Sequence, residues 1–191
     1  MIDQFIQWDI SLFLTLNKWH TPFWDQVMWL ISAKESWYPV YAVLLFLIFR
    51  RQRYYGFVTL VFIALLITLA DQLSVHAFKE VFERFRPCHT PELEGLVHTV
   101  NGKCGGKYGF VSSHASNFFA LATFLAHYFH RRGWSVLFFV LAAIVAYSRI
   151  YLGVHFPLDV ICGGLLGVLT GVLVFALYHL SLKALRNKYG N

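Results

Sequence analysis

The chain has 191 residues, of which 58% are hydrophobic, 18% aromatic and 14% charged, and its mean hydropathy is +0.55. Because soluble proteins carry about 25% charged residues, this composition excludes a soluble globular domain and indicates that lipid surrounds much of the chain. The formal net charge of +6 does not indicate a nucleic-acid partner, since basic loops set membrane topology and basic sites bind phosphate. The length suits one domain, residues 1–191.

The N-terminal segment, residues 3–33, predicts two short helices. Residues 3–18 show an amphipathic pattern that contains Asp9, so this helix either spans the membrane or lies in its interface. Residues 22–33 follow as a second short helix rich in aromatic side chains.

Apolar runs then alternate with polar segments. The runs cover residues 36–50, 54–78, 114–129, 134–147 and 156–182. A helix needs about 20 residues to cross a bilayer, so the shorter runs must extend into their flanks. The pattern predicts an all-α, polytopic transmembrane helix bundle of five to six spans with short interfacial helices. Within it, residues 79–113 form an outer loop.

Basic residues give the predicted bundle an orientation. Alternation of the spans places three basic segments on one side, which the positive-inside rule assigns to the cytoplasm: residues 50–53, 130–132 and 183–188. The other side keeps basic residues that this rule does not explain: Lys79, Arg84, Arg86, Lys103, Lys107 and Arg149. A phosphate ligand on the outer side would account for them.

The first outer segment pairs a lysine with an arginine. Lys79 and Arg86 are seven positions apart, which on a helix is two turns and one face. Two such cations can hold one anion, with arginine able to form two parallel hydrogen bonds. The alternative is a pair of cations that snorkel from a helix end.

The second outer segment places Ser112, Ser113 and His114 directly before an apolar run. Either serine is a suitable N-cap, and the free N–H groups of a first helical turn attract anions. The alternative is ordinary capping beside a surface histidine.

The third outer segment contains His155 and Asp159, four positions apart. On a helix these residues share a face, where the carboxylate can accept a hydrogen bond from the imidazole and hold its tautomer. A buried aspartate near the end of a span is costly without a partner. The alternative is a buried polar pair that only fixes packing.

Together these segments resemble the type 2 phosphatidic acid phosphatase family, membrane lipid phosphatases that share a helical core with vanadium haloperoxidases. The resemblance covers about residues 54–182 and implies that they form the catalytic core. The family pattern K-x6-RP is matched by Lys79, Arg86 and Pro87, and the pattern SR-x5-H-x3-D by Ser148, Arg149, His155 and Asp159. The pattern PSGH is matched in part, by Val111, Ser112, Ser113 and His114.

The resemblance implies a role for each matched residue. His155 would attack phosphorus and carry a phosphohistidine, and Asp159 would orient it. His114 would protonate the leaving oxygen and then help to activate water. The phosphoryl oxygens would be bound by Lys79, Arg86, Arg149, Ser112 and Ser113. No metal and no other cofactor is implied.

These roles predict a lipid phosphatase of a bacterial inner membrane with its site on the periplasmic or outer face. The substrate we expect is undecaprenyl diphosphate, with phosphatidylglycerophosphate, phosphatidic acid and lipid A 1-phosphate as alternatives. A transporter or receptor for a phosphorylated ligand is the non-enzymatic alternative, although binding alone needs no nucleophile. The expected partners are membrane lipid and this substrate, without nucleic acid, and the sequence does not indicate an oligomeric state.

The three cysteines do not fit a structural zinc site, which usually takes four ligands. Cys88 and Cys104 flank one polar loop, where they would form a disulfide if the loop faces an oxidising compartment. We predict this bridge, with Cys162 as a small residue of the core.

Overall fold

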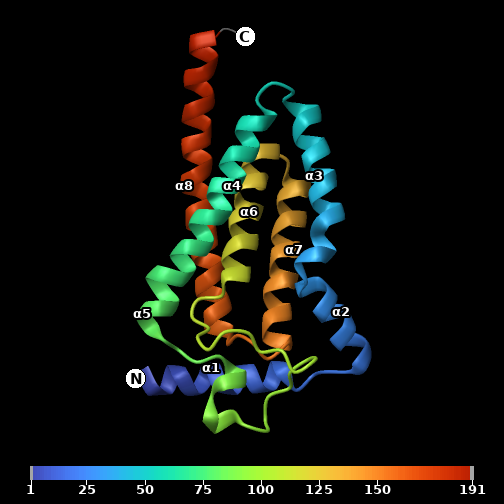
Figure 1. The fold of residues 1–191 in the computed structure, drawn as a ribbon, viewed down its shortest axis with the longest axis vertical. Coiled ribbons are helices and arrows are strands. Elements are labelled where there is room, and N and C mark those ends of the chain that lie inside the picture. Colours follow the sequence, from blue (N-terminus) through green and yellow to red (C-terminus); the bar gives the residue numbers. More distant parts are fainter. Residues whose placement is uncertain (1, 190–191) are drawn as a thin grey trace.

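The structure, a computed structural model, describes residues 2–189, and their regular elements are helices (Figure 1). The α-helices are α1 (Ile2–Asn17), α2 (Pro22–Ser32), α3 (Tyr38–Arg51), α4 (Gly56–Gln72), α5 (Glu80–Phe82), α6 (Ser113–Phe129), α7 (Arg132–Tyr151) and α8 (Pro157–Tyr189). A π-helix, Leu73–Lys79, joins α4 to α5, and short 3-10 turns occupy Lys34–Trp37, Pro87–His89 and Pro91–Leu93. The prediction of an all-α fold is confirmed.

Five helices, α3, α4, α6, α7 and α8, run alongside one another, with α6 at the centre (Figure 1). Helix α6 packs most extensively against α8 and α7, and also contacts α4. The core between them is built from buried apolar side chains such as Leu66, Phe124, Tyr128, Val174 and Tyr178. These residues come from three of the runs that the sequence marks as apolar.

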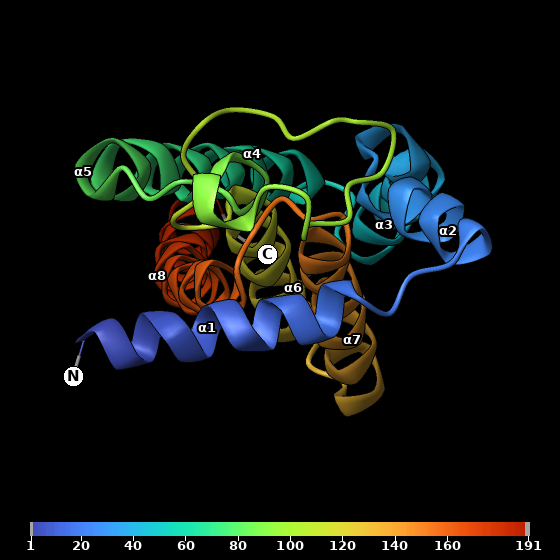
Figure 2. The ribbon, with the colours of Figure 1, turned by 90° about the horizontal axis from the view of Figure 1, so that it is seen from below.

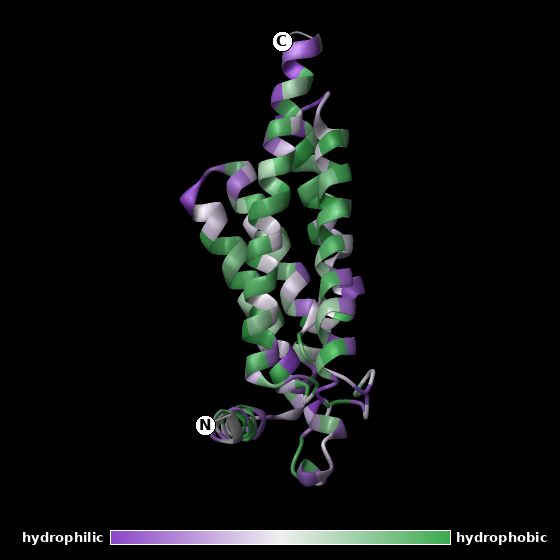
Figure 3. Cartoon of the chain, turned by 90° about the vertical axis from the view of Figure 1, so that its left-hand side faces the viewer, coloured by the Kyte–Doolittle hydropathy of each residue, from purple (hydrophilic) through white to green (hydrophobic). Residues whose placement is uncertain are grey.

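Among residues 2–189, three stretches are long and apolar enough to cross a membrane, residues 56–82, 132–151 and 157–188. Figure 3 shows apolar residues along the middle of the bundle and polar residues at its two ends. The chain is therefore an integral membrane protein. Helices α3 and α6, with 14 and 17 residues, are shorter than the roughly 20 residues of a complete crossing, and the expected five to six spans stay a prediction.

The two ends of the bundle differ in chemistry. The α3–α4 turn, the α6–α7 turn and the end of α8 lie together at one end (Figure 1), called here the basic end because of Arg50, Arg51, Arg131, Arg132 and Lys183. Residues 83–112 cover the opposite end, called the loop end.

Helix α1 lies crosswise over the loop end instead of along the bundle, as Figure 2 makes clear. One side is buried through Asp9, Phe13 and Asn17, whereas Phe5 and Trp8 are more than half exposed. Its 16 residues and its orientation are those of an interfacial helix. Of the two alternatives for residues 3–18, the structure favours the interface.

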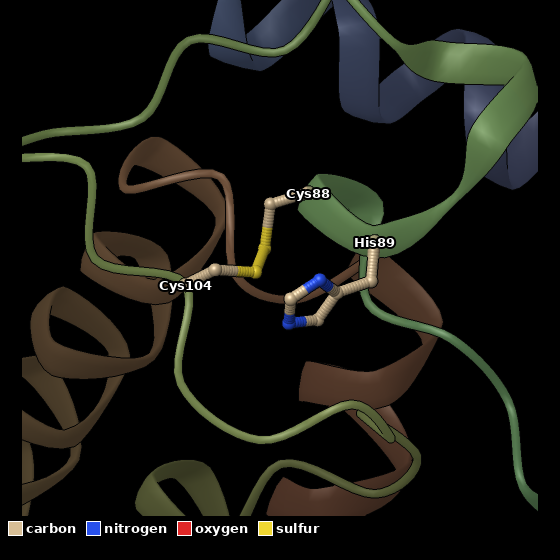
Figure 4. A group of neighbouring side chains, drawn as sticks. All are labelled: Cys88, His89 and Cys104. Atoms are coloured by element: carbon tan, nitrogen blue, oxygen red, sulfur yellow. A yellow bond between two sulfur atoms is a disulfide. The ribbon is translucent and has the colours of Figure 1, made fainter.

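A disulfide joins Cys88 to Cys104 across the loop, with the Cα atoms 6.0 Å apart. The imidazole of His89 lies beside the two sulfur atoms (Figure 4). Asn17 adds a second attachment, because its side-chain amide accepts from His98 N–H at 2.8 Å and donates to the Tyr151 carbonyl at 2.8 Å. Cys162 is partly buried in α8.

Glycines allow α6 and α8 to approach at backbone distance. A Cβ atom on Gly163 would lie 2.6 Å from the Ser112 carbonyl oxygen, and one on Gly167 would lie 2.9 Å from the Ala120 nitrogen and closer still to the Ser116 carbonyl. Small residues are the usual means of close helix packing within membranes. This contact sets the spacing between the first turns of α6 and α8.

We predict that Gly167→Val separates α6 from α8 and destabilises the protein by about 1–3 kcal/mol, the usual cost of overpacking. Thermal unfolding in detergent measures the change. Gly133→Val is the matched control, because a Cβ at Gly133 meets no atom of residues 2–189 within 4 Å. Equal melting temperatures for the two variants would contradict this account of the helix contact.

Candidate active site

The three outer segments that the sequence singles out meet at the loop end. They are the end of the π-helix with the strand-like segment after it, the first turn of α6, and the turn between α7 and α8. Ser112 N–H, at the N-cap of α6, donates to the Asp159 carbonyl oxygen at 2.9 Å. The second and third segments are thereby joined through their backbones.

Lys79 and Arg86 reach the site by different routes. Lys79 ends the π-helix, but the helix stops at Phe82, and Glu83 takes a left-handed conformation with φ of 44°. Arg86 lies beyond this break in extended backbone. The prediction that both residues occupy one helical face is therefore wrong, because the helix ends at Phe82, before it reaches Arg86.

Ser113 stands where the family pattern has glycine, and its hydroxyl group contacts two polar side chains. Lys79 Nζ donates to Ser113 Oγ at 2.5 Å, and this oxygen lies 2.6 Å from Ser74 Oγ. The hydroxyl that a glycine would lack therefore holds the lysine. Ser112, by contrast, caps α6 by accepting from Ala115 N–H at 3.5 Å.

His155 and Asp159 come together as the sequence predicts. His155 Nδ1 lies 3.5 Å from Asp159 Oδ2, longer than a good hydrogen bond. His155 lies in the turn, just before α8, and Asp159 is in the first turn of α8. On the other side of the ring, Arg86 Nη1 is 3.3 Å from His155 Nε2 and 3.3 Å from the Val154 carbonyl oxygen.

This placement determines the proton on the imidazole. A guanidinium can only donate, so Nε2 accepts from Arg86 and the proton resides on Nδ1, facing Asp159. His155 is 1% exposed, and burial, reinforced by the charges of Arg86, Arg149 and Lys79, holds its pKa well below the usual value. The ring is therefore neutral, and the lone pair of Nε2 points toward the cationic group, the name used here for Lys79, Arg86 and Arg149.

Two guanidinium N–H groups in this site have no acceptor among the described residues. They are Nε of Arg86 and Nε of Arg149, and both are buried. Arg149 also donates from Nη1 to Ser32 Oγ, which ties α7 to the end of α2. Buried donors normally have partners, so two orphaned donors near one histidine define a place for an anion with several oxygens.

A cavity of about 490 Å³ adjoins the site between α3, α4 and α6. Near the loop end it is lined by Lys34, His114 and Asn117, and farther along the bundle by apolar side chains such as Ile48, Leu60 and Leu125. His114, in the first turn of α6, thus stands between the cationic group and an apolar cleft.

Two residues of the site, Arg84 and Asp9, are not predicted from the sequence in this role. Arg84 contacts Asp159, with Nη1 2.8 Å from Oδ1, and also contacts Asp9 of α1. Arg84 was visible as a basic residue that topology does not explain, and Asp9 as an acidic residue in an apolar helix. Nothing in their spacing, 75 positions apart, indicated that they pair.

A buried histidine–aspartate pair surrounded by cations, at one end of a lipid-embedded bundle, defines a membrane-bound phosphatase. The family model described as the PAP2 superfamily matches residues 60–183, and the chain belongs to this superfamily. It is a lipid phosphatase, as the resemblance predicts.

The chain is 40% identical to a lipid A 4′-phosphatase of Porphyromonas gingivalis, over 88% of this chain and 72% of that protein. It is 32% identical to an undecaprenyl-diphosphatase of Sulfolobus acidocaldarius, over 86% of this chain and 76% of that protein. The crystal structure of a transmembrane PAP2-type phosphatidylglycerolphosphate phosphatase from Bacillus subtilis is similar in fold, with a TM-score of 0.68 and 26% identity over 91% of this chain and 86% of its own.

We predict that inorganic phosphate stabilises the protein by filling this group of donors. Phosphate at about 100 times its dissociation constant would add about 2.7 kcal/mol of stability, seen as a rise in the melting temperature. Arg149→Gln removes one orphaned donor and should lose most of this rise, whereas Arg131→Gln, at the basic end, should keep it. An equal rise in both variants would contradict a phosphate site at Arg149.

Proposed function

We propose that the protein hydrolyses a lipid phosphate through a covalent phosphohistidine on His155. The observation that supports this most is the position of the ring, with Nδ1 facing Asp159 at 3.5 Å and Nε2 facing the guanidinium of Arg86 at 3.3 Å. Neutral imidazole between a carboxylate and a phosphate-binding cation is suited to nucleophilic attack. A protein that only binds phosphate would have no use for this arrangement.

In the first step, Nε2 of His155 attacks phosphorus and the bond from phosphorus to the lipid oxygen breaks. The negative charge of the bound phosphate favours a protonated His114, and His114 gives this proton to the departing oxygen. The proton on Nδ1 stays in place, and Asp159 stabilises the positive charge on the ring as the ring becomes phosphorylated. In the second step, water gives a proton to His114 and attacks phosphorus, and the phosphorus–nitrogen bond breaks to release inorganic phosphate.

The cations stabilise the charge on the phosphoryl oxygens during both steps. Arg86 and Arg149 supply the donors that have no protein acceptor, and Lys79 is held toward the site by Ser113. The first turn of α6, capped by Ser112, adds backbone N–H groups. Such prearranged donors act strongly in a buried site because no water must reorganise.

The cleft between α3, α4 and α6 suits the apolar tail of the substrate. Its lining changes from Lys34, His114 and Asn117 near the site to aliphatic side chains deeper in the bundle. A phosphate at His155 could then be joined to a chain that remains among apolar groups. The arrangement suits a lipid better than a soluble phosphate ester.

Among lipids, we now place the 4′-phosphate of lipid A first. The relative with this substrate in its name is 40% identical, compared with 32% for the undecaprenyl-diphosphatase. Undecaprenyl diphosphate, the substrate expected from the sequence, becomes the second candidate. Both are large lipids whose phosphate lies at the membrane surface, so the site chemistry alone does not separate them.

The same charges support an orientation. The basic end, with Arg50, Arg51, Arg131 and Arg132, would face the cytoplasm by the positive-inside rule. The active site would then lie on the outer face of a bacterial inner membrane. The Cys88–Cys104 disulfide at the loop end supports this orientation, because disulfides persist in oxidising compartments.

We predict that the purified protein releases phosphate from lipid A, and more slowly from undecaprenyl diphosphate and phosphatidylglycerophosphate, with EDTA present. His155→Ala should lower the rate by at least about 10³-fold, because it removes the nucleophile. His179→Ala, which changes an exposed histidine elsewhere on α8, is the matched control and should be fully active.

The outcomes separate the alternatives. Release that persists in His155→Ala would refute the phosphohistidine mechanism. Faster release from undecaprenyl diphosphate than from lipid A would reverse the order of substrates. Binding of these lipids without release by the wild-type protein would favour the transporter or receptor alternative.

A further inference from the structure

Arg84 lies between two carboxylates from distant parts of the chain. Its Nη1 donates to Asp159 Oδ1 at 2.8 Å and its Nη2 donates to Asp9 Oδ2 at 2.6 Å. Asp159 is fully buried and Asp9 is 4% exposed. One arginine thus connects the crosswise helix α1 to the residue that faces the nucleophile.

Asp9 is itself fixed by a second contact. Its other oxygen, Oδ1, accepts from Leu158 N–H in the first turn of α8 at 2.9 Å. Around it, Phe13 of α1 packs edge-on against Phe156 with ring centroids 5.3 Å apart, and the guanidinium of Arg84 lies 4.3 Å from the same ring centre. Helix α1 therefore holds both the arginine and the start of α8.

These contacts leave one orientation for the Asp159 carboxylate. Its Oδ1 is occupied by Arg84, and its Oδ2 accepts from Phe156 N–H at 3.0 Å while facing His155 Nδ1. Turning the plane of the carboxylate about its χ2 bond would break the contacts with Arg84 and with the Phe156 N–H. The carboxylate plane that directs one oxygen at the imidazole is thus fixed in part by a residue that does not touch the substrate site.

We propose that Arg84 and Asp9 are positioning residues for the nucleophile, with Arg84 orienting Asp159 and Asp9 orienting Arg84. The inference rests on the proposed role of His155. Helix α1 then contributes a positioning residue to the active site, although Asp9 lies outside residues 60–183, the part that matches the family model.

The charges give the proposal a signature that packing alone does not have. Besides Arg84 and Asp9, the charged or titratable groups that act on Asp159 or on its partner His155 are Arg86, Lys79, Arg149, His114 and Cys162. The His155–Asp159 pair is active only with a neutral imidazole and an ionised carboxylate, and one further proton inactivates it. Loss of a nearby positive charge raises the pKa for this further proton, and loss of a nearby negative charge lowers it.

The two variants should therefore move the pH profile in opposite directions. In Arg84→Gln, the acid limb of the kcat/KM profile should move up by about one pH unit or more, and kcat at neutral pH should fall at least about tenfold. In Asp9→Asn, the acid limb should move to lower pH. Arg84→Lys keeps the charge but cannot reach both carboxylates, so its acid limb should stay near the wild-type position while kcat falls.

The experiment measures phosphate release from lipid A in detergent micelles between acid and neutral pH, for the wild type, these three variants and Glu83→Gln. Glu83 is exposed and adjacent to Arg84, so its variant removes a negative charge without removing a contact to Asp159. We expect its profile to match the wild type. Melting temperatures and the intact Cys88–Cys104 bridge establish folding.

Shifts of the same sign in Arg84→Gln and Asp9→Asn, or no shift in either, would overturn the proposal. If Arg84→Gln does not fold, the test is the comparison of Asp9→Asn with Glu83→Gln. Only Asp9→Asn should then shift the acid limb of the kcat/KM profile. Absence of phosphate release by the wild type would instead refute the proposed function. Release by the wild type with unmoved limbs in the variants would refute this inference alone.

Discussion

The backbone contact between α6 and α8 determines where the groups of the active site lie. Gly163 and Gly167 let the two helices meet at a distance that any side chain would increase. At the loop end this contact brings the Ser112 N–H to the Asp159 carbonyl oxygen, 2.9 Å away. His114 at the start of α6 and His155 before α8 are consequently held at the same end of the bundle, although 41 positions separate them.

The site concentrates positive charge where the surroundings are apolar. Arg86 and Arg149 each keep a buried N–H without an acceptor among residues 2–189, a costly state that a phosphoryl group would relieve. The same charges, together with burial, keep the pKa of His155 low and its ring neutral. In the proposed mechanism the same cations bind the phosphate and keep His155 unprotonated, while Arg84 orients Asp159 and Asp159 faces the ring.

Much of the site could be predicted because its chemistry is carried by residues within short segments. The spacing of His155 and Asp159, and the family pattern around Lys79 and Arg86, identified the groups that meet. The shared helical face of Lys79 and Arg86 was wrong because the left-handed Glu83 ends the helix. Likewise, the Asp9–Arg84 pair depends on how α1 crosses the bundle, and local periodicity contains no information about that crossing.

The most direct test of the account is to trap the covalent intermediate. Wild-type protein mixed briefly with a lipid substrate labelled in its phosphate, then quenched in alkali and digested, should yield a labelled peptide that contains His155. His155→Ala should yield no labelled peptide. Label on any other residue, or turnover by the wild type without a labelled enzyme at any time, would contradict the central claim that His155 is the nucleophile.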